Sequence, residues 1–218
     1  AASILIPMDE TQKNHLKAQQ QAQNLLFLNV SQMKCLILLD LFSVCQNIKT
    51  LDLILSEENS AVMDFSGLHK LHNLQHLFIK LHAFDDTPTN LLESLVLYSQ
   101  RNQTLETISF QFFKGTISED YAQLLPFWEN CASTVEKVIL QFSHTDANHD
   151  DIELFYKGLD KLSKLKSLTV LVNGMSFLKA HLDLFLSHYS LLTNILADKL
   201  ALEELHFSAP HIDTRCLN

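Results

Sequence analysis

Histidines are crowded between positions 69 and 82, and histidine is a common metal ligand. His69, His72, His76 and His82 fall within fourteen positions of the sequence. A zinc site needs three or four converging ligands, and no cysteine lies near these four residues. The stretch is also expected to pass from a helix into a strand, which would point the imidazoles in different directions. We therefore expect solvated or capping histidines here, and no bound metal.

A second polar cluster, further along the chain, consists of His144, Asp146, His149, Asp150 and Asp151. Side chains of these types could bind an ion or take part in acid–base catalysis. Asp150 and Asp151, however, directly precede an apolar helical pattern, where the helix dipole favours acidic residues. A helix start therefore explains the two acids, and we expect no cofactor at this cluster or elsewhere in the chain.

The sequence motifs of common enzymes are missing. There is no G-x-S-x-G, H-E-x-x-H or P-loop pattern, and the four glycines are about 2% of the chain against a usual share of about 7%. Cys35, Cys45, Cys131 and Cys216 form no C-x-x-C pair and are too few for a disulfide scaffold in 218 residues. We expect buried thiols and no enzymatic activity, while a cysteine–histidine pair that meets only in the fold stays open.

Charge and hydropathy limit the kinds of partner. The 25 acidic residues outnumber the 16 Lys and Arg residues, and a net charge of −9 repels a phosphate backbone, so we expect no nucleic-acid partner. Hydrophobic residues make up 47% of the chain, enough for a sizeable core. The most apolar stretch, Leu25 to Phe42, is interrupted by polar and charged residues that are expensive in a bilayer. We expect no membrane-spanning segment and no membrane partner.

Cysteine usage and glycosylation sequons point to different compartments. Unpaired buried thiols suit a reducing compartment, and we expect a cytoplasmic location. The sequons Asn29-Val-Ser31 and Asn102-Gln-Thr104 leave a processed secreted form open.

One spacing recurs six times: an apolar residue, two others, a second apolar residue, one other and a third apolar residue. The six units begin at Ile48, Leu74, Leu105, Val135, Leu165 and Leu202, and three of the five intervals between them are 30 or 31 residues. Alternation of this kind predicts a half-buried strand in each unit. Self-similarity at such a period is the sequence pattern of a repeat architecture.

Helical patterns lie between most of these strands. We expect helices over Thr89 to Arg101, from Ser118 to Trp128 with Pro126 bending or ending it early, from Asp150, and over Ser176 to Leu200. A further helix is expected over Val30 to Cys45. Strands joined by helices run parallel, either in a doubly wound sheet or in a solenoid with helices on one face. The alternation in Ile108-Ser-Phe-Gln-Phe112 favours the solenoid, because one face of each strand then meets water.

The strand spacing with one helix per unit resembles the leucine-rich repeats, in particular their helical subclass, which is ribonuclease-inhibitor-like or F-box-associated. This resemblance implies an α/β fold, a right-handed solenoid with a parallel sheet on its concave face and helices on its convex face. Residues 25–218 would form about six units, and residues 1–24 a polar N-terminal cap or linker helix. The Asn or Cys that the family places after each strand is missing from most units, which predicts irregular repeats.

The strand residues that point away from the core are the candidate binding residues. We expect them to contact another protein from two rows across the concave sheet: Asp52, Phe78, Ser109, Ile139, Thr169 and His206 in one, and Ile54, Lys80, Gln111, Gln141, Leu171 and Ser208 in the other. The exposed apolar members resemble the centre of a protein interface. The chain would be a non-enzymatic interaction module, or the recognition arc of a larger receptor or adapter. An α/β enzyme with a site near Phe113, His144 and Asn173, at the carboxyl ends of the strands, is the alternative. The oligomeric state stays open.

Overall fold

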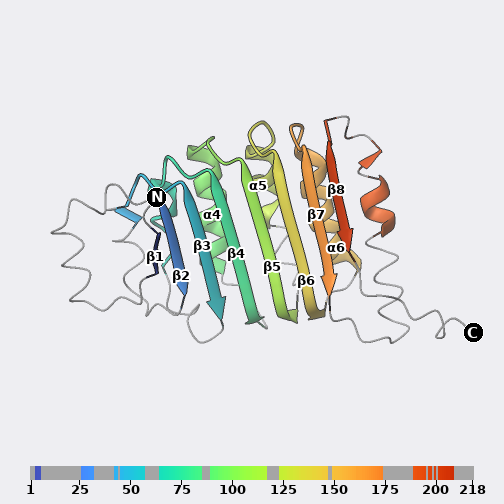
Figure 1. The fold of residues 1–218 in the computed structure, drawn as a ribbon, viewed down its shortest axis with the longest axis horizontal. Helices are drawn as coiled ribbons and strands as arrows, with labels where there is room; N and C mark the ends of the chain where they lie inside the picture. The colour runs from blue at the N-terminus through green and yellow to red at the C-terminus, as the bar shows by residue number, and fades with distance from the viewer. Residues whose placement is uncertain are drawn as a thin grey trace, which may run out of the picture.

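The computed structural model describes residues 3–5, 26–31, 42–43, 45–56, 64–84, 89–116, 123–146, 149–173, 189–194, 196–197, 199 and 201–208. Within these residues the chain forms an α/β structure around one eight-stranded parallel sheet (Figure 1). The strands lie side by side in chain order. They are β1 Ser3–Leu5, β2 Phe27–Ser31, β3 Thr50–Ser56, β4 His76–Phe84, β5 Thr107–Thr116, β6 Lys137–Asp146, β7 Ser167–Asn173 and β8 Glu204–Ser208.

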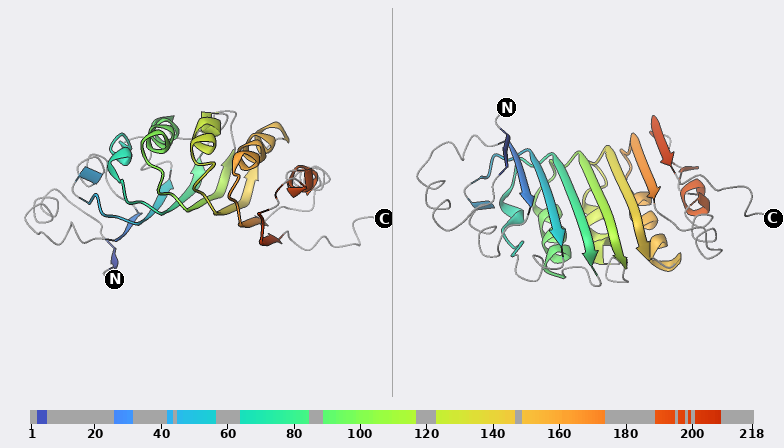
Figure 2. Two further views of the ribbon diagram at one scale, coloured as in Figure 1. Left: turned by 90° about the horizontal axis from the view of Figure 1, so that it is seen from above. Right: turned by 60° about the horizontal axis from the view of Figure 1, so that its bottom comes forward.

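The helices gather on one face of this sheet (Figure 2). They are η2 Leu68–Lys70, α4 Thr89–Arg101, α5 Leu125–Asn130 and α6 His149–Lys161. In the described residues the opposite face carries no helix (Figure 2). A parallel sheet in chain order with helices on one side is the arrangement that stacked strand–helix units produce, so it fits a repeat solenoid. Among the described residues, no helix combines the length and the apolar character needed to cross a bilayer.

The strand pairing confirms the predicted register. Leu51, Leu77, Ile108, Val138, Leu168 and Leu205, the second apolar positions of the six units, are partners from each strand to the next. This alignment follows from the alternation, because a slip of one residue would turn every apolar side chain of a strand towards water. The repeat found in the sequence is therefore a repeat of the fold.

The core lies between the sheet and the helices. Along β3 the side chains alternate between buried and half-buried, and Leu51, Leu53 and Leu55 are fully buried. Aromatic rings fill the centre of the stack, where Phe112 lies parallel to Phe142 at 5.5 Å between ring centroids and Phe110 meets Trp128 edge-on at 5.9 Å. Such contacts add about 0.5–1.5 kcal/mol each to the burial of the rings. Each unit thus depends on its neighbours to cover its apolar side.

A backbone ladder joins successive units where the strands begin. The carbonyl of Lys49 accepts hydrogen bonds from the N–H groups of Gln75 and His76, at 2.8 and 2.9 Å. The same pattern, one carbonyl with two consecutive N–H donors from the next unit, recurs at the carbonyls of Leu26, Gln75, Glu106, Glu136 and Lys166. A carbonyl oxygen has two lone pairs and can accept both bonds. These bonds fix where each strand starts relative to its neighbour, and they do not depend on the Asn or Cys that most units lack after the strand.

Some elements differ from those predicted. The pattern predicts a helix over Val30 to Cys45, whereas Val30 and Ser31 belong to β2, which pairs with β3. Within residues 1–24, assigned to a polar cap or linker helix, Ser3–Leu5 form β1 and pair with β2, so eight strands are present where six units are predicted. These two strands are short, with three and five residues, and carry too few alternating positions to stand out.

The helix around Trp128 also begins later than predicted. The pattern predicts a helix from Ser118 that Pro126 would bend or end, but α5 begins at Leu125 and has Pro126 in its first turn. Proline lacks the N–H group that would be unsatisfied at this place anyway, so it favours the start of a helix and not its end. The helices predicted over Thr89 to Arg101 and from Asp150 are present as α4 and α6. Most of the range predicted as a helix over Ser176 to Leu200 lies outside the described residues.

Candidate protein interface

The outward side of the sheet, which we call the open face, carries both rows of predicted binding residues. The register places Asp52, Phe78, Ser109, Ile139, Thr169 and His206 in one row and Ile54, Lys80, Gln111, Gln141, Leu171 and Ser208 in the other. Parallel strands lie about 4.8 Å apart, so each row reaches over roughly 24 Å. Most of these side chains are half-buried and His206 is exposed. The rows are therefore continuous, and their role in binding stays a prediction.

Ser109 is an exception to the predicted exposure. It is 0% exposed although it belongs to the outward row. Its register partners are Phe78 on β4 and Ile139 on β6, whose larger side chains stand on either side of the small serine. The amide of Gln111 also donates a hydrogen bond to the Ser109 hydroxyl at 3.2 Å. Ser109 therefore supports its neighbours and has no surface of its own to offer a partner.

Two charged residues of the open face neutralise each other. The ammonium group of Lys80 lies 3.0 Å from a carboxylate oxygen of Asp52 on the neighbouring strand. The side chains are only 27% and 13% exposed, respectively, so water screens this pair less than a pair on a flat exposed surface. The pair leaves this end of the open face without net charge.

Amide groups occupy the middle of the second row. Gln111 on β5 donates to Ser109, and Gln141 on β6 donates to the hydroxyl of Ser143 at 3.2 Å. The two glutamines are register partners and are half-buried. In each glutamine the amide nitrogen therefore donates to a serine hydroxyl of the sheet. No described residue donates to the amide oxygen of either glutamine.

Two further rows belong to the open face and were not among the predicted partner-binding residues, although Phe113 and Asn173 were named for the alternative enzyme site. One runs through Thr50, His76, Thr107, Lys137, Ser167 and Glu204, and the other through Ser56, His82, Phe113, Ser143 and Asn173. In the first, His76 is 3.1 Å from the Thr107 hydroxyl, and in the second the rings of His82 and Phe113 stack at 4.7 Å. Both rows lie two residues from a predicted row, so the same alternation extended by one step would have identified them.

A charged rim borders the open face where the strands begin. Lys166 lies 2.9 Å from Glu136 of the preceding unit, and Gln75 donates a hydrogen bond to Glu106 at 3.1 Å. The hydrogen bond and negative charge of Glu136 raise the pKa of Lys166. This bridge is solvent-exposed, and such bridges contribute little to stability. The rim therefore places charged and polar side chains at the edge of the less charged rows.

The histidines that suggested a metal have separate partners. His69 contacts the carbonyl oxygen of Ser66 at 2.6 Å, His72 contacts Asn102 at 2.8 Å, and His82 stacks on Phe113. Across the part of the chain that the structure describes, no group of three or more His, Cys, Asp or Glu residues could hold a metal ion. The side chains of the second cluster, around His144 and Asp150, lie outside the described residues.

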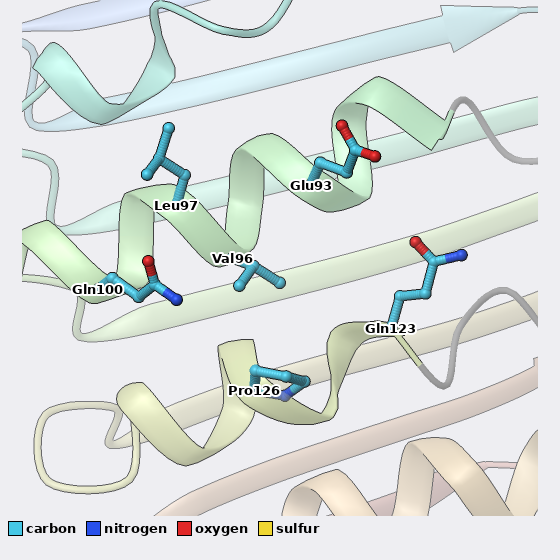
Figure 3. Close-up of a pocket in the computed structure, with 6 residues that line it drawn as sticks. All are labelled: Glu93, Val96, Leu97, Gln100, Gln123 and Pro126. Carbon is cyan, nitrogen blue, oxygen red and sulfur yellow. The ribbon is translucent and has the colours of Figure 1, made fainter.

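The alternative site at the carboxyl ends of the strands is described only in part. Phe113 is half-buried against His82, while the side chains of His144 and Asn173 lie outside the described residues. A shallow groove of about 280 Å³ lies instead on the helical face, between α4 and α5 (Figure 3). It is lined by Glu93, Val96, Leu97, Gln100, Gln123 and Pro126. Its lining lacks the imidazole, thiol or paired carboxylate that acid–base or nucleophilic catalysis needs.

Asn102, the second sequon asparagine, is 5% exposed. Its amide nitrogen donates to the carbonyl oxygens of His69 and Tyr98, at 3.0 and 3.1 Å. Glycan attachment would use this nitrogen, so the folded unit does not present Asn102 for glycosylation. The side chain of Asn29 lies outside the described residues.

Comparison with known proteins finds neither a matching protein family nor a matching curated protein. Among solved structures, the chain is similar to an internalin (inlF) from Listeria monocytogenes, with 11% sequence identity and a TM-score of 0.20. The alignment covers 92% of this chain and 96% of the internalin chain. The similarity is too weak to assign a fold or a function.

Proposed function

We propose that this chain is a non-enzymatic interaction module, a right-handed leucine-rich-repeat solenoid that binds another protein on its open, concave face. The observation that carries the proposal is the register of the outward residues, which run in unbroken rows from β3 to β8. In the described residues no helix lies over these rows. The right-handed sense rests on the strong preference of parallel strand–helix–strand connections for that hand.

A preformed sheet suits binding because it loses little conformational entropy on association. The rows together span roughly 24 Å across the strands and about 20 Å along them. Phe78, Ile139 and Leu171 provide half-buried apolar side chains near the middle, and the charged rim lies outside them. Apolar anchors surrounded by polar residues are where binding energy concentrates in protein interfaces.

The test begins with a pull-down that uses the chain as bait and with identification of the retained protein. The affinity of that protein is then measured for the parent chain and for three variants, Phe78→Glu, Ile139→Glu and Leu171→Glu. Each places a charge at the centre of the open face, and we expect binding at least about tenfold weaker, which corresponds to about 1.4 kcal/mol. Leu97→Glu makes the same change on the helical face (Figure 3) and should bind normally. Retention of every partner at unchanged affinity by all three open-face variants would contradict the proposal.

A further inference from the structure

Charge is distributed unevenly between the open face and the rest of the molecule. Across the four rows, the described strands β3–β8 carry two acids, Asp52 and Glu204, and two lysines, Lys80 and Lys137. The formal charge of these rows is therefore zero, histidines being counted as neutral, although the whole chain carries −9. The acidic excess lies elsewhere; the rim, for example, carries Glu106 and Glu136 beside Lys166, and Glu203 directly precedes β8.

The centre of the open face combines apolar and amide groups. Phe78 and Ile139 stand on either side of the buried Ser109 in the first row, and Gln111 and Gln141 are neighbours in the second. The two glutamines each keep an amide carbonyl oxygen to which no described residue donates. A partner that covers this centre must therefore supply apolar side chains and neutral hydrogen-bond donors.

A charged partner group would gain little here. Burying a charge costs several kcal/mol unless an opposite charge and hydrogen bonds repay it. In the two predicted rows the charged residues are Asp52 and Lys80, at the end formed by β3 and β4, and they already pair with each other at 3.0 Å. The four rows together carry no net charge. An uncharged group loses less hydration and can still use the amides and the apolar side chains.

We propose that the occupant of the open face is an uncharged protein segment, with apolar side chains set against Phe78, Ile139 and Leu171 and amide or hydroxyl side chains set against Gln111 and Gln141. This inference rests on the proposed function and adds the chemistry of the partner. Association is then insensitive to salt, because no charge pair forms across the interface.

The test uses a display library of random peptides of about 12 residues, long enough when extended to reach across the strands β3 to β7. Selected peptides are measured against the chain and two isosteric variants. Gln141→Glu places one negative charge at the centre without changing the side-chain shape. Gln100→Glu, on the helical face (Figure 3), is the matched control.

The expected result has three parts. The selected peptides contain apolar and amide or hydroxyl residues and no net charge. Their affinity changes less than about threefold when salt rises from about 50 to about 500 mM. Gln141→Glu weakens binding about tenfold or more, because the new carboxylate is buried without a partner, while Gln100→Glu leaves it unchanged.

Two other results would overturn the inference in distinguishable ways. In the first, the selected peptides are rich in charged residues, their binding depends strongly on salt, and Ile139→Thr still abolishes it. This result would refute the uncharged occupant and leave the proposed function standing. Failure to select any peptide whose binding responds to Ile139→Thr or Gln141→Glu would count against both. Ile139→Thr keeps a β-branched side chain in β6, and its fold is checked by thermal denaturation beside the parent chain.

Discussion

At the scale of single residues, Asn102 is a structural side chain that links two successive units. It lies at the end of α4, donates to the carbonyl oxygens of His69 and Tyr98, and contacts Nδ1 of His72 at 2.8 Å. Because the amide nitrogen donates to two carbonyls, the amide oxygen is the acceptor and His72 donates from Nδ1. The sequence presents this residue only as part of a sequon.

Replacing Asn102 with alanine should lower the free energy of unfolding by about 1–3 kcal/mol, because the carbonyl oxygen of His69 and the imidazole of His72 lose the side chain that joins them, while the carbonyl of Tyr98 keeps the backbone N–H of residue 102. Urea denaturation of the two proteins measures the difference. Asn73→Ala is the matched control, since Asn73 donates to Asn47 at an exposed position and its loss should cost less than about 0.5 kcal/mol. Equal effects at the two asparagines would contradict the structural role of Asn102.

Cys45 and Cys131 are buried, and burial raises the pKa of their thiols from 9.0 to about 11 and about 12. Burial also raises the pKa of Tyr98 and Tyr156. The unfolded chain therefore releases these protons at lower pH than the folded chain, which favours unfolding once the pH exceeds the ordinary value. Since only a thiolate reacts readily, both cysteines should be inert in the folded protein.

We expect the contribution of these groups to stability to be complete below pH 9 and to be lost as the pH rises towards 11 and 12. Urea denaturation at several alkaline pH values measures the decline, and Cys131→Ala should make it shallower. Thiol labelling at neutral pH should modify Cys45 and Cys131 only when urea unfolds the chain. Labelling of these two at the same rate with and without urea would disprove their burial.

At the scale of elements, the packing of α5 against α6 depends on a glycine. A Cβ atom at Gly158 of α6 would come within 2.3 to 2.7 Å of three atoms of the Trp128 ring on α5. Trp128 is itself 1% exposed and meets Phe110 of β5 edge-on, so a shift of its ring would disturb neighbouring core residues. Gly158 lies inside α6, where glycine is normally unfavourable.

Gly158→Ala should therefore destabilise the protein by about 1–3 kcal/mol, although alanine favours a helix by about 1 kcal/mol. Thermal denaturation measures the change. In a Trp128→Leu background the same substitution should cost less, because the ring that meets the new methyl group is gone. An increase in stability for the single variant would show that α5 and α6 are not in close contact at this point.

At the scale of the whole molecule, stability depends on neighbouring units in both directions. Leu168 and Leu205 are register partners with the same place in their units, yet Leu168 is fully buried and Leu205 is 49% exposed. Leu168 has strands on both sides, whereas β8 is the last strand of the sheet. In a stack of repeats, burial of a residue depends on the unit that follows as well as on its own.

Leu168→Ala should cost about 2–5 kcal/mol, as expected for a buried leucine that leaves a cavity. Leu205→Ala removes the same atoms from a half-exposed site and should cost about 1 kcal/mol or less. Urea denaturation of the two variants under one set of conditions gives the comparison. A loss as large for Leu205 as for Leu168 would mean that further contacts cover β8.

The alternation in the sequence was sufficient to predict the six main strands, their register and the two rows of outward residues. The helical patterns between the strands predicted that they run parallel. Apolar alternation reports which side of a strand leaves water, and this depends on the strand's own residues. Phe78, Ile139 and Gln141 could therefore be placed on the open face before any coordinates.

Only the tertiary structure decided the burial of Ser109, the links made by Asn102, the contact between Gly158 and Trp128, and the shared carbonyls that join the strand starts. The short strands β1 and β2 are likewise recognised only from the pairing of β1 with β2 and of β2 with β3. Each of these features depends on a neighbour some 30 residues away in the chain. A pattern within one unit reports its own hydropathy, but the shape and the hydrogen-bonding groups of the next unit determine what fits against it.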